Sequence, residues 1–331
     1  MPRGEGSNRR WGLVALVMAI GVMAAMITIL NSRSAVVATP ETSDLAEAPE
    51  VLAAALECPT GFASRVHEPV LLVHGTLSNP AENWGWNWAR SLPSLQFPTC
   101  TVALPERATG DLQKSAEYVV AAIRAMATTD GRPIDVVGHS QGGLVAQWAL
   151  RWWPDLRTKV DDVVSLGAPG NGVQGLDLLL KSPVCTPACH QMLPGSVFLA
   201  ALGRPDPQPS RVSYTSISSQ TDQIIEPVFR REPQAGSQSE ILVQAKCPGR
   251  SVGHIEMVAD AAVFALAIDA LVNPGPGDAG RVDPAVCSQV LAPETDVLGK
   301  LRLDVLRFLG SFGENPKTPS TEPPLAGYVT R

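Results

Sequence analysis

Residues 134–148 read Ile-Asp-Val-Val-Gly-His-Ser-Gln-Gly-Gly-Leu-Val-Ala-Gln-Trp, and this stretch decides the fold. Its first four residues predict a strand, and its last six predict the start of a helix. Between them, Gly138-His139-Ser140-Gln141-Gly142 fits the pattern G-x-S-x-G. In a chain with 28 glycines the pattern alone is weak evidence, because an ordinary glycine-rich turn also produces it. The flanking strand and helix favour a sharp turn that exposes the Ser140 hydroxyl above the sheet edge as a nucleophile.

Short apolar or β-branched runs alternate with helical patterns on both sides of this turn. Runs of four to six residues separated by helices predict a mostly parallel sheet covered on both faces, which is an α/β fold. Pro154 ends the helix that follows the turn. The expected strands are Val70–Val73, Thr101–Leu104, Ile134–Gly138, Val163–Leu166, Val212–Ile217 and Ile241–Ala245, and the expected helices include Ser115–Ala127 and Leu144–Trp152.

A serine nucleophile needs a base, and in this kind of fold the chain order is serine, acid, histidine. Of the five histidines, only His190 and His254 follow Ser140. His190 lies beside Cys189 in a Gly- and Pro-rich stretch, before the late strands. His254 comes shortly after the last expected strand, at the edge where this chemistry is built. We therefore predict His254 as the base, against the alternative of a surface histidine without a catalytic role.

The acid must lie between the serine and the histidine. Asp222 follows the strand expected over Val212–Ile217, on a loop at the same sheet edge. Neither Asp177 nor Asp206 follows a strand. We predict that Asp222 orients His254 and stabilises its imidazolium, the alternative being an aspartate that only caps a turn.

The oxyanion site needs backbone N–H groups near the serine. Gln141 begins the helix, and Thr76 follows the strand that ends at Val73, so their N–H groups are the expected donors, with the Thr76 hydroxyl as a third. His74 precedes the serine and is expected to shape this loop. Three tryptophans within residues 84–88 either line an apolar substrate channel or belong to the core.

The chain divides into segments of different composition. Arg9 and Arg10 precede an apolar run over residues 11–30, which predicts a secretory signal or, if uncleaved, a membrane anchor. A pattern with Leu298, Leu301, Val305 and Phe308 on one side predicts an amphipathic helix over Asp296–Leu309. The expected segments are a signal or anchor (1–38), a linker (39–57), a catalytic domain (58–314) with a lid or pocket insertion (168–209), and a C-terminal tail (315–331).

Composition narrows the class of protein. With 331 residues, 45% of them hydrophobic, the chain can bury one large core. The net charge is −6 and no basic run is present, which argues against nucleic acid as a partner. In an exported chain the six cysteines predict disulfides in preference to metal sites or buried thiols, and Cys185 and Cys189 are close enough for a local bridge. They are Cys58, Cys100, Cys185, Cys189, Cys247 and Cys287.

From Cys58 to Cys287 the chain resembles the lipase B family of α/β-hydrolases. The matching segments, in order, are Pro69–Thr76, Ser140–Trp148, Thr221–Ile225, and Cys247 before His254. The resemblance implies Ser140, Asp222 and His254 as the catalytic triad and Thr76 with Gln141 as oxyanion donors. It also implies disulfides Cys58–Cys100 and Cys247–Cys287, which leaves Cys185 for Cys189.

The chain departs from the family at three positions near the site. His74 stands where the family's yeast enzyme has proline, His139 replaces a tryptophan, and Gly170 replaces an aspartate that lines the acyl pocket. These changes leave the expected chemistry intact and the chain-length and enantiomer preference open.

The sequence thus predicts hydrolysis of carboxylic esters through an acyl-enzyme, with triacylglycerol or another water-insoluble ester as substrate. We expect a monomer that acts at a lipid–water interface, secreted or tethered outside the membrane by residues 11–30. The chemistry requires no cofactor and no metal. A polyester depolymerase and an envelope-lipid acyltransferase would use the same machinery, and a non-catalytic binding module is the alternative from another class.

Overall fold

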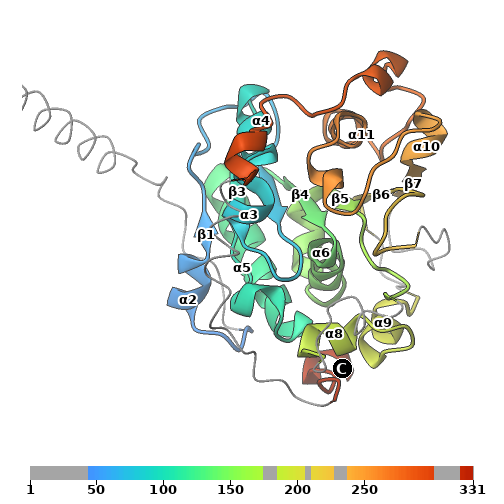
Figure 1. Ribbon diagram of the computed structural model, residues 1–331. Coiled ribbons are helices and arrows are strands. Elements are labelled where there is room, and N and C mark those ends of the chain that lie inside the picture. The colour runs from blue at the N-terminus through green and yellow to red at the C-terminus, as the bar shows by residue number, and fades with distance from the viewer. Residues whose placement is uncertain (1–43, 174–184, 206–209, 227–236, 302–320, 331) are drawn as a thin grey trace, which may run out of the picture.

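The computed structural model describes residues 44–173, 185–205, 210–226, 237–301 and 321–330. Its centre is a seven-stranded sheet with the order β1-β3-β2-β4-β5-β6-β7 (Figure 1). Only β1 runs antiparallel to its neighbour, and the other pairs are parallel. The strands are β1 (Leu56–Glu57), β2 (Val70–Val73), β3 (Thr99–Val102), β4 (Ile134–His139), β5 (Val160–Leu166), β6 (Ser213–Ser218) and β7 (Ser237–Leu242).

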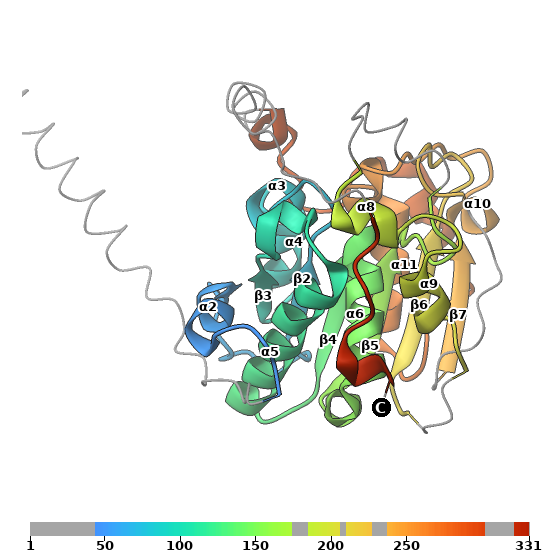
Figure 2. The ribbon, with the colours of Figure 1, turned by 90° about the horizontal axis from the view of Figure 1, so that it is seen from below.

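Helices cover both faces of this sheet, so its central strands are buried on both sides (Figure 2). One face packs against α5 and α6, and the other against α3, α4 and α11. The two hydrophobic clusters draw alternate residues from the same strands: Leu71 and Val136 face α5 and α6, whereas Leu72 and Val137 face α11. The helices are α2 (Pro49–Ala54), α3 (Pro80–Trp84), α4 (Trp88–Ser94), α5 (Leu112–Asp130), α6 (Gln141–Trp152), α8 (Pro187–Gln191), α9 (Val197–Leu202), α10 (Val243–Lys246) and α11 (Ala261–Val272).

This architecture confirms the predicted α/β fold, with corrections to the bounds of two strands. The strand expected over Thr101–Leu104 lies two residues too late, because β3 covers Thr99–Val102. The strand expected over Ile241–Ala245 lies too late, because β7 ends at Leu242 and α10 begins at Val243. Most of β7 is polar and exposed, as an edge strand with one solvated face can be. The apolar run that suggested the strand therefore marks only its buried end.

The described part of the expected linker is not a free linker. Leu52 is buried, and β1 pairs with β3 through Leu56 and Glu57. Asp44 forms an ion pair with Arg124 at 2.7 Å. The structured domain therefore begins before Cys58, because this segment covers the edge of the sheet.

The described end of the expected tail also packs on the domain. Val329 is buried, and the Trp148 Nε1–H donates to the Tyr328 hydroxyl at 3.0 Å. Of the expected amphipathic helix, residues 296–301 are described, and 297–301 of them are helical. Residues 302–309 and the expected signal or anchor (1–38) lie outside the described residues. No helix in the described ranges is long and apolar enough to span a membrane.

All six cysteines form disulfides in the structure. The pairs are Cys58–Cys100, Cys185–Cys189 and Cys247–Cys287, the three that the resemblance implies. The first ties the start of the domain to β3, and the last fastens the loop after α10 to the segment that follows α11.

Candidate active site

Ser140 occupies the turn between β4 and α6, where its backbone adopts φ 54° and ψ −125°. A non-glycine residue with positive φ is strained by about 1–3 kcal/mol, so the surrounding packing must hold it there. Part of that support is the Ser140 N–H, which donates to the Leu166 carbonyl of β5 at 2.8 Å. The turn therefore has the strained strand-to-helix geometry that the sequence predicts.

The glycines around Ser140 permit this close packing. A Cβ on Gly142 would lie 2.3 Å from the Val73 carbonyl oxygen, and one on Gly138 would lie 2.5 Å from the Gly143 nitrogen. Both contacts are with backbone that cannot move aside. Glycine is therefore required at these positions to seat α6 directly on the ends of β2 and β4.

Asp222 and His254 meet beside this turn, on the loops after β6 and after α10. His254 donates from Nδ1 to Asp222 Oδ2 at 2.8 Å, and both side chains are buried. Asp222 Oδ1 accepts the backbone N–H groups of Ile224 and Ile225, each at 2.8 Å. The contact with Asp222 places the proton on Nδ1, which leaves Nε2 with the lone pair that a general base needs.

Side chains and backbone hold the two loops together. The His254 N–H donates to Gln223 Oε1 at 3.1 Å. The Thr221 hydroxyl accepts from Val252 N at 2.7 Å and lies 3.0 Å from its carbonyl oxygen. The loop that presents His254 is therefore positioned by the loop that presents Asp222.

Arg250 fixes the base of the His254 loop. Its guanidinium pairs with Asp260 at 2.7 Å and donates to three carbonyls in the segment that the Cys247–Cys287 disulfide anchors. Charge-assisted bonds of this kind are stronger than neutral ones. Arg250 and the disulfide thus brace the same loop.

Two buried histidines shape the neighbourhood without acting as bases. Burial lowers the pKa of His74 to about 4 and that of His139 to about 3, the latter with a contribution from the nearby His254. His74 Nε2 accepts from the Leu104 N–H at 3.0 Å, and its Nδ1 donates to the Gly75 carbonyl at 2.9 Å. It joins the loop after β2 to the segment after β3, as a loop-shaping residue would.

Ser140, His254 and Thr76 line one cavity of about 270 Å³. Gln141 is the first residue of α6, so the helix does not use its backbone N–H. The Thr76 hydroxyl donates to the Gln141 side-chain oxygen in this structure. Because the Thr76 hydroxyl is engaged in this bond, it could donate to a substrate only after leaving Gln141.

The rest of the cavity wall is predominantly apolar. It is lined by Trp86, Val173, Met192, Ile224, Ile225 and Val258. Trp84 and Trp88 are fully buried in the core, so of the three neighbouring tryptophans only Trp86 faces the cavity. Trp86 therefore lines the apolar cavity, as one prediction had it, and Trp84 and Trp88 belong to the core, as the other had it.

An apolar rim borders the cavity mouth. Lys300 lines the cavity, and the preceding Asp296 N–H donates to the Trp86 carbonyl at 2.7 Å, which fixes the helical segment 297–301 there. On this segment Leu298 and Leu301 are 79% and 59% exposed. Such exposure of large apolar side chains beside a cavity is typical of a surface that binds something apolar.

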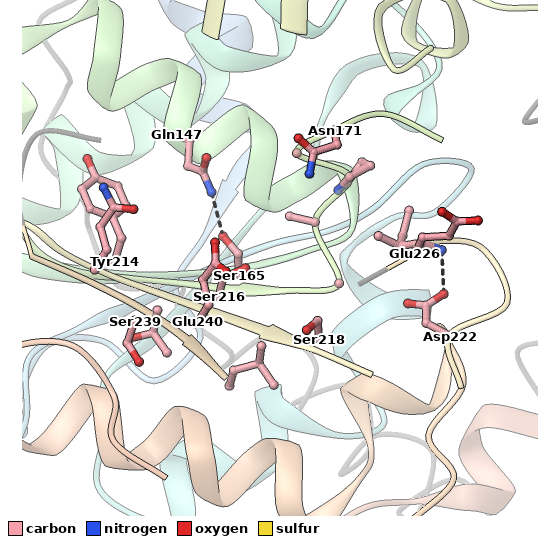
Figure 3. Close-up of a pocket in the computed structure, with 18 of the residues that line it drawn as sticks. Gln147, Ser165, Asn171, Tyr214, Ser216, Ser218, Asp222, Glu226, Ser239 and Glu240 are labelled. Carbon is pink, nitrogen blue, oxygen red and sulfur yellow. Dashed lines mark hydrogen bonds between the residues drawn. The ribbon is translucent and has the colours of Figure 1, made fainter. Parts of the chain in front are cut away.

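Asp222 also lines a second pocket, a groove that shares Pro169 and Ile225 with the cavity (Figure 3). The groove has a volume of about 90 Å³ and is lined by hydroxyl groups from β5, β6 and β7, among them Ser165, Ser216 and Ser239. Gly170, one of the three positions at which the chain departs from the family that it resembles, lines this groove and not the apolar cavity.

The predicted residues are therefore brought together: Thr76, Ser140, Gln141, Asp222 and His254 meet at the carboxyl ends of the strands. Asp177 and Asp206, the rejected alternatives for the acid, lie outside the described residues. Sequence reasoning missed four positions that shape this site: Asn83, Gly167, Gln223 and Arg250. No motif marks them, because their partners are distant in sequence.

Comparison with known proteins agrees with this geometry. Residues 69–223 match the family model of palmitoyl protein thioesterase. Lipase B of Pseudozyma antarctica is 31% identical over 221 residues, which is 66% of this chain and 65% of that protein. The chain thus spans just under two thirds of the length of this relative.

The structure superposes on the crystal structure of Aspergillus fumigatus lipase B with a TM-score of 0.76 and 28% identity. The match covers 86% of this chain and 72% of that one. Together with the parallel sheet and the turn at Ser140, these matches show that the chain belongs to the α/β-hydrolase superfamily and is similar to lipase B.

Proposed function

We propose that the protein is a serine hydrolase that cleaves carboxylic esters of lipids through an acyl-enzyme. One observation carries the proposal: His254, held by Asp222 at 2.8 Å, lines the same apolar cavity as the strained Ser140. A base oriented by a carboxylate beside a serine on such a turn is the arrangement that activates a hydroxyl for attack.

The reaction follows from these positions. Ser140 Oγ attacks the ester carbonyl while His254 Nε2 takes the hydroxyl proton, and the carbonyl π electrons move to oxygen. The backbone N–H groups of Thr76 and Gln141 stabilise that oxyanion. His254 then returns the proton to the leaving alcohol, and the acyl group remains on Ser140. Water repeats the sequence and releases the acid.

The cavity supports an apolar acyl group as the substrate's main contact. Burial of an apolar chain gives about 25 cal/mol for each Å² removed from water, and the wall around Trp86 and Met192 offers such contacts. The exposed Leu298 and Leu301 extend this apolar surface outward, which supports a water-insoluble ester docked at a lipid–water interface. Its lipase B relatives support triacylglycerol as the first substrate to test.

Three disulfides support export to an oxidising compartment. We propose that the protein acts outside the cytosol as a monomer, secreted or tethered through residues 11–30. The lipid substrate would then be met at the outer surface or in the medium.

The test is a series of p-nitrophenyl esters of increasing chain length, with emulsified triacylglycerol and an acyl thioester as separate arms. The thioester arm is included because of the palmitoyl protein thioesterase match. We expect ester hydrolysis that Ser140→Ala abolishes, with a preference for chains that fill the cavity. Activity on the thioester alone would replace the proposal, and equal activity in Ser140→Ala would refute it.

A further inference from the structure

His139 lies directly before Ser140, and its ring contacts two loops that come from distant parts of the chain. The side chain is 4% exposed. Its Nε2 lies 3.0 Å from the backbone carbonyl oxygen of His254, and its Nδ1 lies 3.1 Å from Asn83 Oδ1. The rings of His139 and His254 also pack on each other with centroids 5.0 Å apart.

The bond to His254 fixes the proton on His139. A carbonyl oxygen only accepts, so Nε2 must carry the hydrogen. Both backbone groups of His254 are then held by side chains: Gln223 accepts its N–H, and His139 donates to its carbonyl. Together with the Nδ1 bond to Asp222, these contacts determine where the His254 ring stands relative to Ser140.

The other ring nitrogen reaches the oxyanion loop. Asn83 Oδ1 accepts the Gly75 N–H at 3.2 Å, and Gly75 directly precedes Thr76. A Cβ on Gly75 would lie 3.1 Å from Ser140 Cβ, so this loop touches the nucleophile itself. His139 and Asn83 together therefore connect the loop of the base with the loop of the oxyanion donor.

The Asn83 carboxamide serves two neighbours with opposite requirements. Gly75 N–H needs an acceptor, whereas a His139 ring protonated only on Nε2 presents a lone pair at Nδ1 and needs a donor. With Oδ1 turned to both, the buried Asn83 Nδ2 has no partner among the described residues. The lone pair of His139 Nδ1 therefore packs against Asn83 Oδ1 without a hydrogen bond between them, and the contact of the two side chains is one of packing.

We propose that His139 is a positioning residue that, through Asn83, holds the His254 loop and the oxyanion loop in register about Ser140. The inference rests on the proposed ester hydrolysis and adds to it the device that aligns base and oxyanion donor. His139 does not touch the substrate's reacting atoms. It acts through the backbone of His254 and of Gly75, and it is effective as a neutral ring.

The expected effect is on rate and not on ground-state binding. A displacement of about 1 Å in a catalytic group costs about 100-fold in rate. We therefore expect His139→Leu, which keeps the volume but removes the hydrogen bond to the His254 carbonyl and the ring contact with Asn83, to lower kcat about 10- to 100-fold with KM little changed. His139→Gln, whose amide nitrogen can take the place of Nε2, should recover most of this loss.

A double-variant cycle tests whether His139 and Asn83 act as one unit. We expect Asn83→Leu to lower kcat less than His139→Leu, and the double variant to lose no more than the worse single variant. Losses that multiply would show two independent structural effects and overturn the bridge. Circular dichroism and melting temperature are measured for each variant, so that only folded proteins enter the cycle.

Nitrogen NMR of the imidazoles gives a readout that does not need turnover. We expect His139 to carry its proton on Nε2 and stay neutral from pH 5 to 9, because its pKa is about 3. We also expect Asn83→Asp, which places a negative charge beside the ring, to raise the pKa of His139. The other ionisable groups that act on His139 are His254, Asp222 and His74.

The outcomes separate the two proposals. If the wild-type protein cleaves no ester, the proposed function fails, and a proton found on His139 Nε2 then shows only a structural contact with the His254 loop. If esters are cleaved and His139→Leu matches the wild type in kcat, the positioning role is refuted. A folded His139→Gln variant as slow as His139→Leu would also refute it.

Discussion

Buried carboxylates at the two ends of the central sheet differ in the hydrogen-bond partners that surround them. At the carboxyl end, Asp222 accepts two backbone N–H groups and the His254 ring, so its charge is satisfied. At the amino end, Asp135 and Asp162 begin β4 and β5, and each has one buried oxygen without a partner among the described residues. The first end is built to keep a charge, and the second is not.

Protonation resolves the conflict at the amino end. Burial and the neighbouring Asp161 and Glu68 raise the pKa of Asp162 to about 8. Burial and the charge of Asp162 also raise the pKa of Asp135 well above its usual range. Among the described residues, no group of three or more His, Cys, Asp or Glu side chains is arranged to hold a metal ion. At the amino end, protonation removes the charge of a buried carboxyl group. At the carboxyl end, the His254 ring and two backbone N–H groups stabilise the charge of Asp222.

The largest effect should come from removing the charge at the site. Asp222→Asn should lower kcat by about 10⁴-fold, because it loses the partner that fixes the His254 tautomer. Asp162→Asn is the matched control, with the same chemical change at the opposite end, and should leave kcat unchanged at neutral pH. Steady-state kinetics on a soluble p-nitrophenyl ester decides. Near-full activity in Asp222→Asn would mean that another group is the acid.

A packing change at the site end should have a smaller but clear effect. Gly167 has φ 58°, and a Cβ there would lie 2.8 Å from Met257 Sδ and 3.2 Å from Asp222 Oδ2. Gly167→Ala should displace the Asp222–His254 pair and lower kcat about 10- to 100-fold. Gly249→Ala is the control, because its φ is also positive but no atom lies within 4 Å of the added Cβ. Equal losses in both variants would attribute the effect to backbone strain.

The apolar surface at the site end should matter only for insoluble substrate. Leu298→Asp and Leu301→Asp are each expected to lower activity on emulsified triacylglycerol several-fold more than activity on a short soluble ester. Val66→Asp is the matched control, since Val66 is 60% exposed just before β2 starts, at the other end of the sheet. If losses on both substrates are equal and follow the melting temperature, the segment is structural and the protein is a plain esterase.

The smallest effect concerns stability at the amino end. The pKa of Asp162 is about 8 in the folded protein against an ordinary 3.8, so the folded state binds the proton more tightly than the unfolded state. Its contribution to stability is therefore present at low pH and lost as pH rises toward 8. Asp162→Asn should raise the melting temperature at pH 9 and have progressively less effect toward pH 4. A gain that is independent of pH would contradict this account.

The comparison also explains what the sequence could predict. The turn at Ser140 was predictable because its strand, glycines and helix are contiguous, and Asp222 and His254 because chain order and strand ends constrain them. Arg250 braces the His254 loop through Asp260 and through backbone carbonyls near Cys287. No local sequence pattern predicts these contacts. Asn83 directly precedes three closely spaced tryptophans, and the sequence pattern indicated a role only for the aromatic residues.

The errors have physical causes as well. β7 is a polar edge strand, so a search for apolar runs placed it too late in the chain. Residues 49–57 resemble the end of a linker because they are mostly small and follow an acidic, Pro-containing stretch. The buried Leu52 and the pairing of β1 with β3 nevertheless attach them to the domain. Edge elements bury little surface and leave a weak signal in the sequence.

One measurement tests the central claim most directly: labelling with a p-nitrophenyl alkylphosphonate, followed by peptide mass mapping. The reagent forms a covalent bond only with a nucleophile that a neighbouring base activates. The account predicts one label per chain, on Ser140, with labelling lost in Ser140→Ala and strongly slowed in His254→Ala. A label on any other residue, or labelling of Ser140→Ala at the wild-type rate, would contradict it.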